Sequence, residues 1–142
     1  MIAYFDSSAV VPLLVDDEPG GGVCRRVWAV AEALVASRLV FVETAAALAQ
    51  AARLGRLTAA THARALVGLE HVWRQFEVIE VGDALIRRAA TLARAHALRG
   101  FDAVHCAAAL VVSDRNTVAL SGDRALLSAW RANGVDVIDT LA

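Results

Sequence analysis

Short apolar segments alternate with longer helical segments along the whole chain of 142 residues. Apolar runs of strand length are predicted at residues 2–5, 34–36, 76–81, 117–120 and 135–138. One or two helices are predicted in each connection between them, from the spacing of apolar residues. Because parallel strands need long, usually helical crossovers, this alternation predicts an α/β fold with a mostly parallel sheet. No linker or repeat interrupts the pattern, so we expect a single domain over residues 1–142.

The composition narrows the class of protein. Hydrophobic residues make up 58 % of the chain, which fits an alanine-rich helical core or an apolar patch that a partner or second copy covers. No apolar run approaches the roughly 18 residues of a membrane span, and the first residues lack the basic segment of a signal peptide. Cys24 and Cys106 lie far apart, without a CxxC motif. We therefore expect reduced thiols in a cytoplasmic protein.

The basic residues exclude several catalytic machineries. All 14 are arginine and none is lysine, which excludes a P-loop nucleotide site. It also argues against a receiver domain or a haloacid dehalogenase phosphatase, both of which rely on a lysine. That phosphatase would need a second acid two residues after Asp6, where this chain has Ser8. The net charge of −1 at pH 7 gives no general attraction to nucleic acid.

Four of the fifteen acidic residues stand out by position: Asp6, Glu43, Asp102 and Asp123. Asp6 and Asp123 each follow a predicted strand directly or nearly so. In parallel sheets, ligands bind beyond the carboxyl ends of the strands, near the point where the strand order reverses. Each of these two aspartates could equally be the N-cap of the next helix.

Glu43 and Asp102 lie in strongly apolar segments, each in the predicted first turn of a helix. Each is either a partner of the helix dipole or a ligand. All four acids point to one rim of the sheet, where converging carboxylates need cations or raised pKa values. Mg²⁺ or Mn²⁺ would suit such oxygen ligands. A site of this kind suits hydrolysis of a phosphodiester.

Four short motifs around these acids together resemble those of PIN domains, in particular the VapC-type toxins of bacterial toxin–antitoxin pairs. They are YFDSSA at 4–9, VETAAAL at 42–48, GFDAVHCAAA at 100–109 and LSGDRALL at 120–127. The resemblance covers essentially the full chain. It implies a five-stranded parallel sheet in the order 3-2-1-4-5, flanked by helices.

The resemblance also implies a function. It implies an endoribonuclease that depends on Mg²⁺ or Mn²⁺, cleaves tRNA, rRNA or mRNA, forms a homodimer and is inhibited by a cognate antitoxin. The implied catalytic acids are Asp6, Glu43, Asp102 and Asp123, with the metal on Asp6, Asp102 and Asp123. The hydroxyls of Ser7 and Ser121 would orient carboxylates or water. Ser121 stands where the family often has threonine, which keeps the hydroxyl.

Three further groups of residues are open to two interpretations. Arg99 and Arg124 adjoin Asp102 and Asp123, and either bind RNA phosphates or form salt bridges. His105 follows Asp102 by three residues on the same helical face, and is either a satisfied core histidine or part of the site. The three tryptophans are expected in core or interface packing rather than in base stacking.

Two other functions remain compatible with this pattern. One is a catalytically inactive PIN-fold module that only binds a partner protein, although the four intact acids argue against it. Such a module need not bind a divalent cation, so metal binding would separate the two interpretations. The other is a PIN nuclease that acts on DNA or flap structures, which the lack of an accessory domain disfavours.

Overall fold

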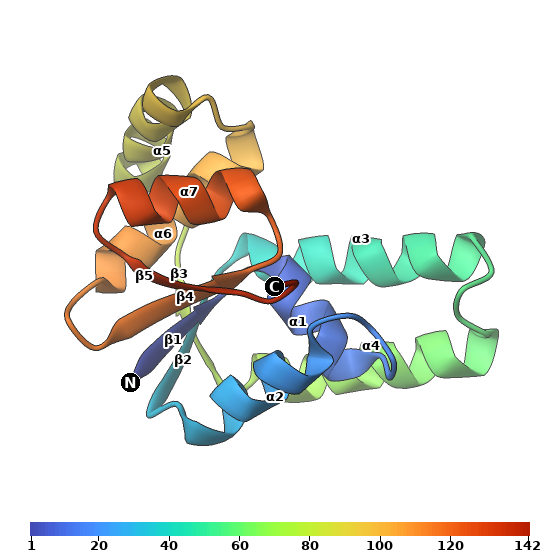
Figure 1. Cartoon of the computed structure of the whole chain (residues 1–142). Coiled ribbons are helices and arrows are strands. Elements are labelled where there is room, and N and C mark those ends of the chain that lie inside the picture. Colours follow the sequence, from blue (N-terminus) through green and yellow to red (C-terminus); the bar gives the residue numbers. More distant parts are fainter.

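The computed structural model describes residues 1–142 as five strands and seven helices (Figure 1). The strands are β1 (Ile2–Phe5), β2 (Ala33–Ser37), β3 (Phe76–Ile79), β4 (Thr117–Ser121) and β5 (Asp136–Asp139). The helices are α1 (Ser7–Leu14), α2 (Gly21–Val30), α3 (Leu39–Arg53), α4 (Ala59–Trp73), α5 (Asp83–His96), α6 (Gly100–Val112) and α7 (Arg124–Ala132). None of these helices combines the length and apolar character that a membrane-spanning segment requires.

The strands form one parallel sheet in the order β3-β2-β1-β4-β5, as predicted. The chain first builds outward from β1 through β2 to β3, and then returns to place β4 on the other side of β1. The strand order therefore reverses between β1 and β4. The carboxyl ends of these two central strands are the place where this topology favours a ligand site.

The sheet separates two apolar cores. Helices α5, α6 and α7 cover one face, and α1, α2 and α4 lie on the other side (Figure 1). Successive side chains of a strand point to opposite faces, so Tyr4 packs into the first core and Ala3 and Phe5 into the second. The tryptophans take part in this packing, as predicted. Trp130 is fully buried, with its ring centroid 5.7 Å from that of Tyr4.

The strands lie within two residues of their predicted bounds. Helix α2 ends at Val30, because the backbone N–H of Glu32 donates to the carbonyl of Met1 and the chain joins the sheet. Helix α3 begins at Leu39 and has no acid in its first turn. The expectation that Glu43 lies in that first turn was therefore wrong, so the helix dipole does not explain this residue.

Candidate active site

Asp6 lies directly after β1 and caps helix α1. Its Oδ1 accepts hydrogen bonds from the backbone N–H of Ala9, at 3.1 Å, and from the hydroxyl of Ser8, at 2.7 Å. Its Oδ2 accepts a hydrogen bond from the hydroxyl of Ser121, at 2.6 Å. Asp6 is only 5 % exposed. Burial raises the pKa of Asp6 above its ordinary value, and the charge of His105 and the hydroxyl donors oppose this rise.

Ser121, the last residue of β4, connects Asp6 to Asp123. While its hydroxyl donates to Asp6, the same oxygen accepts from the backbone N–H of Asp123, at 2.9 Å. Asp123 in turn caps α7, because its Oδ1 accepts from the backbone N–H of Leu126, at 2.9 Å. Capping occupies only one oxygen of Asp123. The capping and ligand interpretations of this residue are therefore compatible, since the cap does not use Oδ2.

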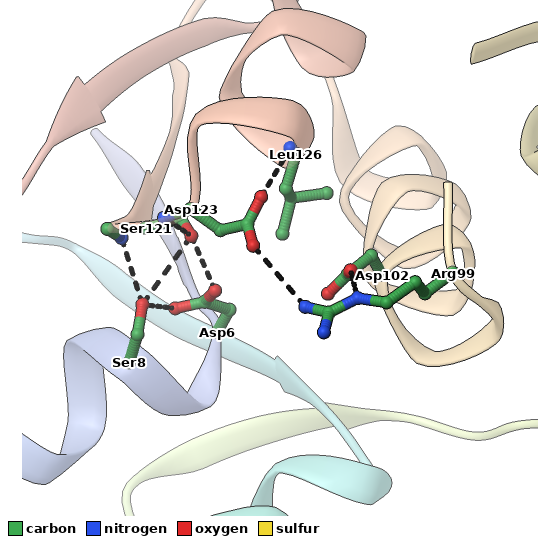
Figure 2. A network of polar contacts seen from close by, with 8 residues as sticks. Asp6, Ser8, Arg99, Asp102, Ser121, Asp123 and Leu126 are labelled. Carbon is green, nitrogen blue, oxygen red and sulfur yellow. Dashed lines mark hydrogen bonds and ion pairs between the residues drawn. The ribbon is translucent and has the colours of Figure 1, made fainter. Parts of the chain in front are cut away.

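Arg99 lies between Asp102 and Asp123 (Figure 2). Its Nε donates to Oδ2 of Asp102, at 3.0 Å, and its Nη2 lies 3.6 Å from Oδ2 of Asp123. The Arg99 side chain is 83 % exposed, whereas that of Asp102 is 18 % exposed. The exposed guanidinium of Arg99 thus neutralises two acids that lie at the N-terminal ends of α6 and α7.

Glu43 is held by a buried polar chain that reaches back to β1. Its Oε1 lies 2.6 Å from Nε2 of His105, and Nδ1 of His105 lies 2.8 Å from the hydroxyl of Tyr4. Tyr4 and His105 are almost completely buried. Burial raises the pKa of Tyr4, which therefore stays protonated. With a neutral imidazole, Tyr4 donates to Nδ1 and Nε2–H donates to Glu43.

His105 experiences two opposing effects on its pKa. Burial lowers the pKa, because an imidazolium is poorly solvated in the core. The hydrogen bond and the charge of Glu43 raise it and prevail, so the pKa of His105 lies above its ordinary value of 6.5. Both interpretations of this residue therefore hold: it is a satisfied core histidine, and it contacts a candidate catalytic acid.

The four acids lie around one edge of the sheet, but they do not form a preformed metal site. Glu43 and Asp102 line an open cavity of about 370 Å³, together with Arg99, Gly100 and Phe101. Asp6 and Asp123 are joined to this region through Ser121 and Arg99. No three acidic, histidine or cysteine side chains lie close enough together to hold a metal ion.

The donor chemistry of the site nevertheless fits a hard divalent cation. Carboxylates and hydroxyls supply only oxygen atoms, which Mg²⁺ and Mn²⁺ prefer. The guanidinium of Arg99 already takes the place of a cation between Asp102 and Asp123. Because this side chain is exposed, it can leave without disturbing the core. Movement of Arg99 would free an oxygen of each acid.

The predicted serines and arginines behave differently from one another. Ser121 contacts Asp6, as expected of an orienting hydroxyl. Ser7 makes no side-chain hydrogen bond, and Ser8 instead provides the second hydroxyl at Asp6. Arg124 is exposed and forms no ion pair, whereas Arg99 forms two. Tyr4 was not predicted, although its place two residues before Asp6 in an apolar strand was a usable signal.

Comparison with known proteins adds an independent finding. The PIN domain family model matches residues 3–129. Ribonuclease VapC45 of Mycobacterium tuberculosis is 41 % identical over 136 residues, which cover 96 % of this chain and 94 % of that protein. The match extends over nearly the full length of both proteins.

Solved structures share the same fold. The crystal structure of Mycobacterium tuberculosis VapC20, described as a sarcin–ricin loop cleaving toxin, is 20 % identical, with a TM-score of 0.67 over 96 % of this chain and 97 % of that one. A toxin–antitoxin complex from Klebsiella pneumoniae is 13 % identical, with a TM-score of 0.66 over 97 % of each chain. At such identities the likeness concerns the fold.

Proposed function

The chain belongs to the PIN domain family, among its VapC-type members, and we propose that it is an endoribonuclease that acts as the toxin of a toxin–antitoxin pair. The name of its relative VapC45, a ribonuclease, supports this activity. The observation that carries the proposal is the connected set of acids at the point where the strand order reverses. Asp6 and Asp123 follow the two central strands, and Ser121 joins them.

We further propose that Asp6, Asp102 and Asp123 bind Mg²⁺ or Mn²⁺, with Glu43 completing the catalytic acids. Such a cation supplies charge neutralisation at a phosphodiester and makes water acidic enough to act as a nucleophile. The protein contributes the orientation of its oxygen donors. Ser8 and Ser121 fix both oxygens of Asp6, while the helix cap at Leu126 fixes one oxygen of Asp123.

Glu43 and Arg99 have separate roles in this proposal. His105 holds Glu43 at the wall of the cavity that it shares with Asp102. Arg99 is the only arginine at this cavity, and its planar guanidinium suits a phosphate oxygen. Once a cation occupies the acids, Arg99 is free to turn from Asp102 and Asp123 to the phosphate of the substrate.

The proposed partners follow from the family and from its solved complexes. A cognate antitoxin is expected to inhibit the protein, as the toxin–antitoxin complex of the same fold suggests. The substrate is a tRNA, rRNA or mRNA, and the protein acts in the cytoplasm, where these RNAs are found. Exposed apolar residues such as Val67, at 71 %, and Val111, at 54 %, leave surface for an antitoxin and for a second copy in a homodimer.

The test is induced expression in a bacterial host without the antitoxin, with wild type beside Asp6→Asn at matched protein level. Growth and the 5′ ends of total RNA are followed together. Growth arrest with discrete new RNA ends, lost in Asp6→Asn, supports the proposal. Arg115→Ala serves as the control, because this exposed residue precedes β4 at the end of the strand opposite to the site. Equal cleavage by Asp6→Asn would contradict the assigned role of the carboxylate.

Titration of the purified protein with Mn²⁺ separates the nuclease from the inactive binding module. We expect saturable binding by the wild type that weakens in Asp6→Asn and in Asp123→Asn. Both variants keep an oxygen for the helix cap, so the fold should be preserved. Absence of any binding by the folded wild type would favour the module that only engages a partner protein.

A further inference from the structure

Phe101 is the one exposed aromatic residue of the chain. The sequence contains eight aromatic residues, and the other seven are buried or half-buried in the two cores. Phe101 is 65 % exposed and immediately precedes Asp102 at the start of α6. A ring of this size contributes most by burying its apolar area. Its exposure beside an acid of the candidate site therefore points to an occupant that the chain itself does not provide.

Phe101 stands at the junction of two cavities of opposite character. On one side is the polar cavity with Glu43, Arg99 and Asp102. On the other side is an apolar cavity of about 320 Å³ between α5 and α6, which Phe101 shares with Ile86, Ala89, Ala90, Ala93, Ala103 and Val104. Gly100 also lines both cavities, and the space beside its α-carbon is open. The two cavities thus form one continuous surface.

The polar cavity and the apolar cavity together match the phosphate and the base of a nucleotide. A phosphodiester needs the cationic and metal-binding side, whereas a base needs an apolar wall and a flat ring. The small side chains of Ala89, Ala90 and Ala93 leave room beside the ring of Phe101. Stacking between a base and an aromatic ring accepts any base, because every base has a π-face.

We propose that Phe101 is a stacking platform for one base of the RNA, adjacent to the phosphodiester that the acids cleave. The proposal rests on the proposed ribonuclease function and adds a residue that would hold one base of the substrate. A base in a duplex already stacks on its neighbours, and only an unpaired base can turn onto a protein ring. The proposal therefore requires an unpaired base next to the cleaved phosphodiester.

Arg99 favours RNA over a second copy of the chain as the occupant. Arg99 lines the polar cavity only two residues before Phe101, and its side chain is 83 % exposed. A ring and an exposed guanidinium at this spacing match a base and its phosphate. Phe101 also lines the acidic cavity, so a protein interface over its ring would lie beside the place proposed for the substrate.

The experiment measures stacking and cleavage separately. Two variants are made, each in the wild type and in Asp6→Asn. Phe101→Leu keeps an apolar side chain without the ring, whereas Phe101→Trp keeps a ring. Leu54→Ala is the control, because Leu54 is 64 % exposed and is the C-cap of α3. This end of α3 projects away from the sheet (Figure 1). The probe is a short unpaired RNA that carries the fluorescent base 2-aminopurine, and the same strand paired with its complement.

In the Asp6→Asn background, we expect the unpaired probe to be quenched on binding. Phe101→Leu should abolish the quenching and weaken binding by roughly tenfold or more, whereas Phe101→Trp should retain both. The paired probe should bind more weakly and show no dependence on residue 101. Unchanged quenching and affinity in Phe101→Leu would overturn the proposal.

Three further outcomes separate this proposal from the ribonuclease function on which it rests and from a contact with a second copy of the chain. Cleavage by the wild type that is unaffected in Phe101→Leu would refute the stacking platform and leave the ribonuclease intact. Quenching that depends on Phe101, without cleavage by the wild type, would support the platform and refute the nuclease. A wild-type dimer that becomes a monomer in Phe101→Leu, with unchanged RNA binding, would assign the ring to a second copy and overturn the proposal.

Discussion

Nε2 of His105 lies 2.6 Å from Oε1 of Glu43, and this is the only hydrogen bond of the Glu43 side chain. The two residues are 62 positions apart in the sequence and come from α6 and α3. Behind His105, the hydroxyl of Tyr4 contacts the other ring nitrogen, at 2.8 Å. The orientation of a candidate catalytic acid thus depends on a buried histidine that β1 holds in place.

Replacement of His105 should therefore affect both stability and cleavage. His105→Leu leaves the buried hydroxyl of Tyr4 without its partner, which should lower the free energy of unfolding by about 1–3 kcal/mol. His105→Gln keeps an N–H donor for Glu43 and should retain more of the cleavage rate. Urea denaturation and RNA cleavage are measured on both variants. Equal cleavage rates in the two variants would argue against a positioning role.

The stability of the protein should also depend on pH through His105. Burial lowers the pKa of His105, but the hydrogen bond and charge of Glu43, together with the charges of Asp6 and Asp102, raise it above 6.5 in the folded state. Because the pKa is raised in the folded state, His105 contributes its full share to the free energy of unfolding below pH 6.5. This contribution is lost as the pH rises through the folded-state pKa.

The measurement is the free energy of unfolding of wild type minus that of His105→Gln, from below 6.5 to mildly alkaline pH. We expect this difference to decrease as the pH rises, because Gln does not titrate. A difference that stays constant, or that increases with pH, would contradict the direction assigned to the pKa of His105.

The elements of the fold were predictable because strands and helices leave periodic patterns of apolar residues. The short apolar runs at residues 2–5 and 117–120 are typical of buried parallel strands, and strands are found there. The order of the strands came from the resemblance to PIN domains and not from periodicity. The same patterns pointed to Asp6 and Asp123 as candidates, because each acid follows the end of a predicted strand.

The contacts within the site could not be predicted from local patterns. Ser7 and Ser8 are adjacent and chemically alike, and the cap geometry at Asp6 decides which hydroxyl reaches the carboxylate. The contact between Tyr4 and His105 joins residues that are 101 positions apart. Such a pair depends on how α6 packs on β1, and no spacing in the sequence encodes it.

The serines at Asp6 allow a matched comparison. Ser121→Ala removes a donor to Asp6 and an acceptor for the backbone N–H of Asp123, so we expect a loss of about 1–3 kcal/mol in the free energy of unfolding. Without this donor, the pKa of Asp6 should rise further and Mn²⁺ should bind more weakly. Ser7→Ala removes no side-chain hydrogen bond and should change stability by less than about 0.5 kcal/mol. The prediction fails if the two variants unfold and titrate alike.

Arg99 should affect cation binding and RNA binding in opposite directions. Its guanidinium lies against Oδ2 of Asp102 and of Asp123, so it competes with a divalent cation for the same oxygens. Arg99→Ala should therefore bind Mn²⁺ more tightly in the absence of RNA. The same variant should bind RNA more weakly, since it lacks the only arginine at the cavity. Its stability should hardly change, because an exposed ion pair contributes little.

Arg115→Ala is the matched control, since Arg115 is also exposed and adjoins an acid but forms no ion pair, and it precedes β4 at the end of the strand opposite to the site. It should leave both binding constants unchanged. Isothermal titration with Mn²⁺, followed by RNA binding at saturating Mn²⁺, measures the two effects in turn. Weaker Mn²⁺ binding by Arg99→Ala would mean that the guanidinium organises the acids instead of competing for them. In that case Arg99 would remain in place when the cation binds, and the phosphate would need another partner.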